Sequence, residues 1–138
     1  MSSLFRIFDT AASGMAAQSV RLNTTASNLA NADSVGSSPA TTYRAREPVF
    51  AAIRNGLGRD AETSGVRVVG VTESQAPIGS RYEPGNPLAD ADGMVYTPNV
   101  NPVDELVNMI SASRAYQNDV EVMNNAKQLA LKTLDLGK

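Results

Sequence analysis

Large apolar side chains fall on one helical face near each end of this 138-residue chain, and those of the first face recur at seven-residue spacing. The first series is Phe8, Met15, Leu22 and Leu29, with Leu4 and Ala11 beside it, and the second is Leu106, Met109, Val120, Met123, Ala130 and Leu134. A seven-residue repeat returns side chains to one face only in a helix that packs along another helix. The two series therefore predict two long helices that pair with each other and with copies of the chain.

The helix boundaries have local signals of their own. The first helix is expected from about Leu4 to Ala30, with polar residues such as Gln18 facing outward. Gly14 in its middle costs about 1 kcal/mol relative to Ala, which a close approach of another helix would explain. The second helix is expected to begin after Asn101, a good N-cap that Pro102 follows at the first helical position, and to continue to about Leu136.

The middle of the chain holds six of the seven prolines and has a different pattern. Residues 66–72 (VRVVGVT) alternate and are β-branched, which predicts a strand. Further strands are expected at 43–53, interrupted by Pro48, and at 94–96, and a hairpin tip is expected at 55–64. The fold class is therefore α+β, with a small β-rich middle domain between long terminal helices that form a coiled-coil-like inner domain. The expected divisions are 1–34 for the first helix, 35–98 for the linker and middle domain, and 99–138 for the second helix.

Composition argues against several classes of function. The chain has no histidine and no cysteine, so the commonest acid–base, thiol and zinc chemistries are closed to it. A net charge of −2 gives no basic footprint for nucleic acid or for an anionic membrane. No apolar run reaches the roughly 20 residues of a membrane span, and the charged Arg6 and Asp9 do not fit a cleaved signal peptide. We expect no enzyme activity, no cofactor, no metal and no small-molecule substrate.

Three short motifs allow sharper alternatives. Asp90 to Gly93 resembles part of a calcium loop, but Asn101 stands where the bidentate glutamate belongs, so a plain turn is favoured. Tyr43 with its neighbouring arginines and Phe50 could stack on single-stranded nucleic acid, although a strand that faces solvent or another subunit fits an acidic chain better. Carboxylates at 73, 83, 90 and 92 could supply a pair for sugar hydrolysis, but acidic side chains in a turn-rich region are usually solvated.

Three long blocks carry a resemblance. Residues 13–34 (SGMAAQSVRLNTTASNLANADS) are similar to the signature of the flagellar axial proteins of the rod and hook. Residues 73–95 (ESQAPIGSRYEPGNPLADADGMV) and 98–137 resemble the proximal-rod branch of that family, with Met94 and Pro102 standing where Tyr and Val are expected. Together the blocks cover most of the chain.

The resemblance implies a structural subunit of the proximal rod in the basal body of the bacterial flagellum. Its implied partners are copies of itself, other rod proteins and the flagellar type III export apparatus, which would carry it out without a cleaved signal. The alternatives are another axial subunit, of the distal rod or hook, or an assembly factor that acts on peptidoglycan. The residues expected at subunit interfaces are Leu4, Phe8, Ala11, Gly14, Met15, Leu22, Leu29, Leu106, Met109, Tyr116, Val120, Met123, Ala130 and Leu134.

Overall fold

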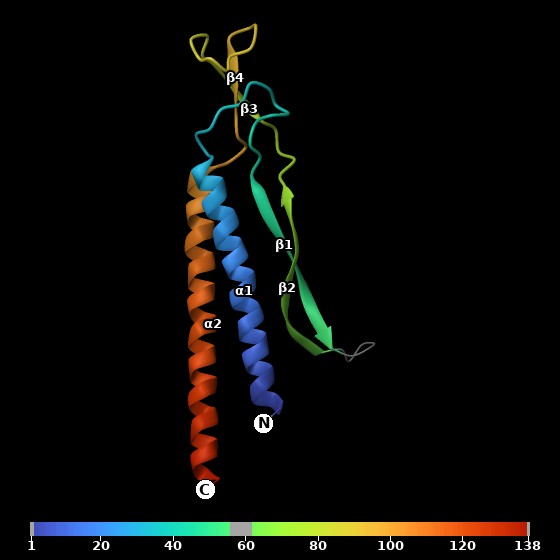
Figure 1. The fold of residues 1–138 in the computed structure, drawn as a ribbon, viewed down its shortest axis with the longest axis vertical. Helices are drawn as coiled ribbons and strands as arrows, with labels where there is room; N and C mark the ends of the chain where they lie inside the picture. Colours follow the sequence, from blue (N-terminus) through green and yellow to red (C-terminus); the bar gives the residue numbers. More distant parts are fainter. Residues whose placement is uncertain (1, 56–61, 138) are drawn as a thin grey trace.

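The computed structural model describes residues 2–55 and 62–137 of the chain, and Figure 1 shows its fold. Along the sequence, four strands lie between two long helices. The elements are α1 (Ser2–Ala30), β1 (Arg46–Asn55), β2 (Glu62–Glu73), β3 (Gly79–Tyr82), β4 (Met94–Thr97) and α2 (Pro102–Leu136). The α+β fold class predicted from the sequence is confirmed.

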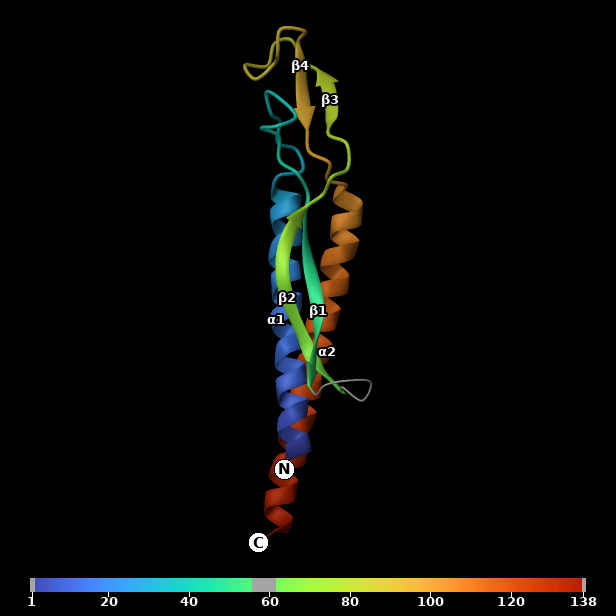
Figure 2. The ribbon, with the colours of Figure 1, turned by 90° about the vertical axis from the view of Figure 1, so that its right-hand side faces the viewer.

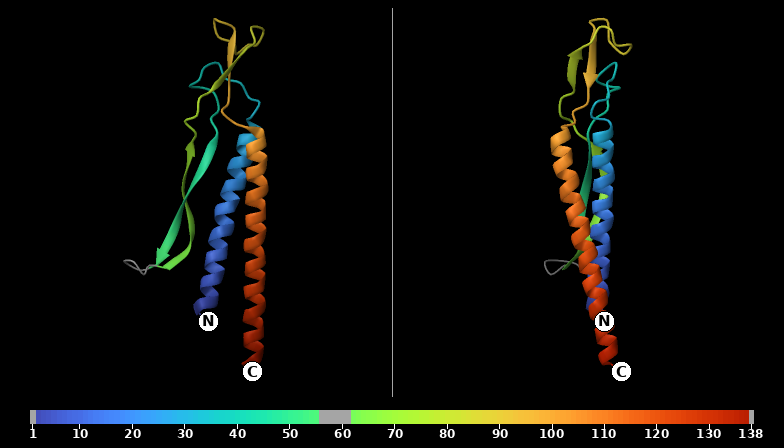
Figure 3. Two further views of the ribbon diagram at one scale, coloured as in Figure 1. Left: turned by 180° about the vertical axis from the view of Figure 1, so that it is seen from behind. Right: turned by 90° about the vertical axis from the view of Figure 1, so that its left-hand side faces the viewer.

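The elements form an elongated slab. The helices run antiparallel along each other, so the two chain ends lie near one end of the molecule (Figure 1). The β1–β2 hairpin lies along α1 on the side away from α2, and the small β3–β4 hairpin forms a head beyond the other end of the helices (Figures 2 and 3). The order across the slab is therefore α2, α1 and the β1–β2 hairpin.

Local chemistry accounts for the ends of α2. The Asn101 side chain accepts a hydrogen bond from the Val103 amide at 3.1 Å, Pro102 opens the helix, and Asp104 and Glu105 lie in its first turn. Acidic groups at that position are favoured by the positive end of the helix dipole. The helix ends at Leu136, so the predicted cap and both predicted ends are confirmed. Within the described residues, neither helix is long and apolar enough to cross a membrane.

The β1–β2 hairpin is longer than the sequence pattern indicated. Residues 66–72 lie within β2 as predicted, but the expected interruption at Pro48 is wrong, because β1 continues through Pro48, which pairs with Val71. The sheet has only two strands, so each strand has a free edge where a proline without an N–H is tolerated. The expected hairpin tip falls partly outside the described residues.

The head is organised around one carboxylate. Asp90 accepts hydrogen bonds from the Asp92 and Met94 amides and from the Tyr96 hydroxyl, each at 2.9 Å. The Met94 amide, and after it the Tyr96 hydroxyl, hold the pKa of Asp90 below its usual value. Gly93 in the same turn has a φ of 75°, a conformation that favours glycine. The segment forms a turn, and β4 forms where 94–96 was predicted.

Two asparagines, one on α1 and one in the loop before α2, hold the backbone at the open end of the β1–β2 hairpin. Asn28, which is 1% exposed on α1, donates to the Arg46 carbonyl and accepts from both the Arg46 amide and the Tyr43 hydroxyl. Asn99 accepts from the Ala45 amide and donates to the Ser74 carbonyl. Both side chains thus supply the hydrogen-bond partners that a neighbouring strand would otherwise give to the backbone where it enters or leaves the hairpin.

The Asn28 anchor generates a test of how the hairpin is held. Asn28→Leu removes the side chain that binds the Arg46 amide and carbonyl, at about 1–3 kcal/mol for each buried polar group left unpaired, and leaves the Tyr43 hydroxyl with Ser27 alone. We expect a lower free energy of unfolding, measured by urea denaturation, and faster hydrogen exchange at the Arg46 amide. Asn23→Leu, at an exposed position of the same helix, is the matched control and should change neither value appreciably. Equal effects of the two variants would contradict the anchoring role.

Candidate assembly interface

The interior of the chain contains almost no large apolar side chains. Among the described residues the buried apolar ones are Ala11, Ala17, Ala45, Ala112, Ala126 and Val95, so only one is larger than alanine. The accessible surface is 9235 Å², whereas a compact monomer of 14.5 kDa is expected to expose about 6,900 Å². The chain therefore folds without covering its own apolar surface.

The contact between α1 and α2, called the seam below, is built from small and polar groups. Asp119 of α2 lies so close to Gly14 of α1 that a Cβ added there would stand 2.5 Å from the carboxylate oxygen. About two turns further along α1, Arg21 donates through Nε to the Asn108 side chain at 2.9 Å. The close helix approach predicted at Gly14 is confirmed, and the neighbouring helix is the chain's own α2.

Gln18 also belongs to the seam, so its predicted outward position is wrong. The residue is half-buried, and its Oε1 atom is buried without a hydrogen-bond partner in the described part of the chain. Gln18 lies seven residues after the buried Ala11, so the seven-residue repeat returns it to the face that meets α2. The polar side chain alone did not reveal that position.

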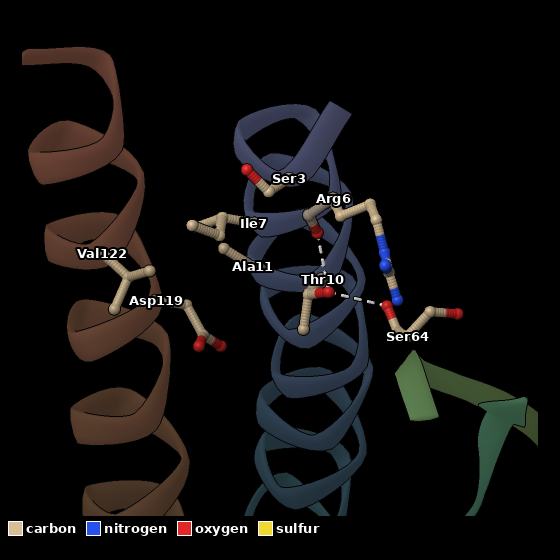
Figure 4. Close-up of a pocket in the computed structure, with 8 residues that line it drawn as sticks. All are labelled: Ser3, Arg6, Ile7, Thr10, Ala11, Ser64, Asp119 and Val122. Atoms are coloured by element: carbon tan, nitrogen blue, oxygen red, sulfur yellow. Dashed lines mark hydrogen bonds between the residues drawn. The ribbon is translucent and has the colours of Figure 1, made fainter. Parts of the chain in front are cut away.

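Near the amino-terminal end of α1, the seam opens into a groove of about 510 Å³. Figure 4 shows Ile7 and Ala11 on the side of α1 that faces Asp119 and Val122 of α2. The Thr10 hydroxyl, on another side of α1, donates to the Ser64 carbonyl at 2.7 Å (Figure 4). The first helix thus uses two faces within the chain, one for α2 and one for the hairpin.

The large side chains of the two series lie one position beyond the seam. Met15 directly follows Gly14 on α1, and Met123 directly follows Val122 on α2. Along any α-helix, each step of one residue toward the C-terminus turns the side chain by about 100° in the same sense. Because α1 and α2 are antiparallel, this one-residue step brings the large side chains of both helices to the same side of the helix pair. We call this surface the stripe: Phe8, Met15, Leu22, Leu29, Met109, Tyr116, Met123 and Ala130. Every member is half-buried.

The other residues expected at interfaces divide into three groups. Leu4 and Val120 are half-buried like the stripe, whereas Leu106 and Leu134 are about half exposed, at 50% and 55%. Ala11 and Gly14 pack within the chain at the seam. Whether any of these residues meets another subunit stays a prediction.

Sequence reasoning missed an exposed apolar set beside Leu106. Val103, Val107 and Ile110 are 67%, 62% and 56% exposed. Their spacing of four and three residues places them on one helical face, so the signal was present in the sequence. The hairpin carries a second exposed set that was also missed: Val49, Phe50, Val69 and Val71.

The side chains considered for nucleic-acid stacking and for sugar hydrolysis already have partners within the chain. Tyr43 has the guanidinium of Arg46 5.5 Å from its ring centre and hydrogen-bonds to Asn28, so its face and hydroxyl are both used within the chain. Asn86, through its side-chain hydrogen bond, and also Arg81 hold the pKa of Glu83 below its usual value. A general acid for sugar hydrolysis needs a raised pKa. In the described residues, no three acidic side chains gather as a metal site would require.

Comparison with known proteins decides the family. Residues 8–36 match the model described as flagella basal body rod protein, and residues 91–136 match the one described as flagellar basal body rod FlgEFG protein C-terminal. The chain is 54% identical to the flagellar basal-body rod protein FlgC of Salmonella typhimurium over 98% of both chains. It is 55% identical to that of Escherichia coli O6:H1 over 98% of both, and 38% identical to that of Aquifex aeolicus over the full length of both. The chain belongs to the flagellar basal-body rod protein FlgC family.

The resemblance read from the sequence is therefore confirmed. The two matched ranges fall on the helices: 8–36 covers most of α1, and 91–136 covers β4 and α2. Every member of the stripe lies inside one of these ranges. In this member of the FlgC family, the family-defining segments are thus the ones that carry the incompletely covered apolar surface.

The seam offers a direct test. Gly14→Leu places bulk against Asp119, and overpacking of this kind costs about 1–3 kcal/mol. We expect a lower free energy of unfolding, and we expect Asp119→Ala in the same chain to restore part of the loss, because it removes the atoms that clash. Ala16→Leu, at an exposed position of α1, is the control. Strictly additive effects of Gly14→Leu and Asp119→Ala in urea denaturation would contradict the contact.

Proposed function

We propose that this chain is a structural subunit of the flagellar basal-body rod, which assembles with copies of itself and with other rod proteins through its terminal helices. The relatives named FlgC support the rod assignment. The observation that carries the assembly mechanism is the stripe: a continuous row of half-buried large side chains along a helix pair whose own contact is made of small and polar groups. Side chains placed in this way gain their remaining burial only from a neighbour.

The same proposal assigns a role to each part of the chain. Residues 1–34 and 99–138 would form an inner domain that packs against neighbouring subunits, and residues 35–98 would form the middle domain. Heterologous contacts that do not close generate a helical array, which suits a shaft. The β1–β2 hairpin contacts α1 alone among the helices in the described residues, so a neighbour can approach α2 without displacing it.

The proposal places the protein in the rod of the basal body, delivered there by the flagellar type III export apparatus. The helices of a free subunit would lack part of their burial, because the stripe is only partly covered outside an assembly. Partial order before assembly, completed by packing in the rod, is consistent with this arrangement. A peptidoglycan-acting enzyme has no comparable support, since Glu83 and Asp90 are held ionised by their hydrogen-bond donors.

A charge within the stripe should block assembly. Leu22→Asp places a carboxylate where neighbouring subunits would exclude water, and an uncompensated charge in such a position is strongly unfavourable. In a strain whose only copy carries this change, we expect loss of swimming and of rods in isolated basal bodies. Measurement of the exported protein by immunoblot separates failed assembly from failed export.

The adjacent Asn23→Asp variant is the matched control, because Asn23 is exposed on the same turn of α1. It adds the same charge to the same helix and should leave swimming and rod yield close to those of the parent strain. If the Leu22→Asp protein is exported at parental levels and the cells swim normally, the stripe is not a subunit interface.

A further inference from the structure

Two exposed apolar patches lie on opposite flanks of the slab. The α2 patch consists of Val103, Leu106, Val107 and Ile110, which are 50–67% exposed, and the hairpin patch consists of Phe50, Val69 and Val71, which are 39–61% exposed. Both lie outside the stripe. Neither is covered by the described part of the chain.

Helical geometry directs the α2 patch away from α1. Asn108 and the fully buried Ala112 mark the face of α2 that meets α1. At about 100° per residue, Val103 and Ile110 point to the side of α2 opposite to that face. The hairpin lies beyond α1 on the other flank (Figures 1 and 3). No Cα atom of α2 lies within 8 Å of one in β1 or β2 among the described residues.

The two patches stand at the same level along the slab. The Arg21–Asn108 hydrogen bond fixes the level of α2 against α1, and at about 1.5 Å per residue the α2 patch lies within about 8 Å of that level. The Val66 amide binds Ser13 at 3.1 Å, which places Val66 about 12 Å below Arg21. Val69, three residues further up β2 at about 3.3 Å per residue, then lies within about 3 Å of the Arg21 level.

An independent anchor gives the same level. Asn28 binds the Arg46 backbone, and Arg46 pairs with Glu73 across the hairpin. The rise from Ser13 to Asn28 is about 22 Å along α1, and the rise from Val66 to Glu73 is about 23 Å along β2. The two rises agree, so both anchors give the same position of the hairpin along α1. The hairpin patch therefore lies level with the α2 patch.

We infer that the α2 patch of one copy packs against the hairpin patch of a second copy placed beside it. The inference rests on the proposed function and adds the identity of a lateral contact. The contact joins two different surfaces, so the third copy can add to the second in the same way, and the row does not have to close. Because the two patches lie at the same level, a second copy can meet the first by moving sideways, with little shift along the helix axes.

The size of the patches fits a contact that works only in an array. Three or four side chains of this kind present on the order of a few hundred Å², well below the roughly 800 Å² per partner of a stable pairwise interface. One such contact would not hold a dimer in dilute solution. Repeated at every lateral neighbour, and combined with the stripe, it gains strength from the other contacts of the assembly.

Cysteine pairs test the contact, because the natural chain has no cysteine. A chain with both Val69→Cys and Ile110→Cys, expressed as the only copy, should give disulfide-linked multiples of the 14.5 kDa subunit when isolated rods are oxidised mildly. The α2–hairpin separation within one chain exceeds 8 Å, beyond the roughly 7 Å Cα spacing that a disulfide spans, so each link must join two copies. We expect at least tenfold more linked product than in either single variant.

The control pair keeps Ile110→Cys and moves the second cysteine to Arg54→Cys, about 20 Å further down the hairpin. It should form no ladder. Leu106→Cys with Val71→Cys is a second pair at the original level and should reproduce the ladder. Photo-crosslinking from a benzophenone attached to Ile110→Cys identifies the occupant by mass spectrometry, and the expected product is a hairpin peptide of this chain.

The outcomes separate the inference from the function it rests on. Rods that contain the variant chain but give no ladder with either pair overturn the lateral contact and leave the rod assignment intact. A disulfide-linked dimer of the single Ile110→Cys variant in the same yield as the linked product of the pair, or a photoproduct with a different rod protein, also overturns it. Rods from which the parent chain is absent contradict the proposed function itself.

Discussion

The chain covers its large apolar side chains only in part, because small and polar side chains form the contact between its two helices. Gly14 stands against Asp119, and alanines occupy the buried positions at 11, 112 and 126. The residues of the stripe are turned one position outward, where they are half-buried. Full burial of a Leu, Met or Phe side chain is worth about 1.5–3 kcal/mol. Six of the eight stripe residues are of these three types, so part of the available stabilisation is left to neighbouring subunits.

The polar anchors matter because that arrangement leaves little apolar core to hold the β-rich parts in place. Asn28 and Asn99 bind backbone groups at the open end of the β1–β2 hairpin, around the start of β1 and the end of β2. Ser13 adds a third fixed point lower on α1 by accepting from the Val66 amide. Hydrogen bonds are directional, so they define the level of the hairpin along α1 in a way that loose apolar contact would not. The proposed lateral contact depends on this fixed level.

The sequence predicted the elements whose signals are local or periodic. The two helices, the Asn101 cap, the strands at 66–72 and 94–96 and the close approach at Gly14 follow from spacing, capping and turn chemistry. Strand β3 was missed because all four of its residues are exposed, so it has no alternation to detect. Pro48 was misjudged because the free edges of a two-stranded sheet relax the usual restriction on proline.

The division between seam and stripe was not predictable from the series alone. A seven-residue repeat identifies a helical face but not the residue at its centre, and a shift of one position moves every side chain by about 100°. The large residues indicated Phe8, Met15 and Leu22 as the centre of the contact. The chain instead centres it on the small residues Ala11 and Gly14 and on the polar Gln18. The interface list therefore combined residues from two different surfaces.

Oxidation of methionine tests the central claim most directly. Met15, Met109 and Met123 belong to the stripe, and Met94 in the head is an internal reference. Dilute hydrogen peroxide converts accessible methionine to its sulfoxide, and mass spectrometry of digested monomers and of isolated rods gives a rate for each residue. The account predicts that the three stripe methionines react at least tenfold more slowly in rods than in monomers, relative to Met94. Equal rates in the two states would show that no neighbour covers the stripe and would contradict the account.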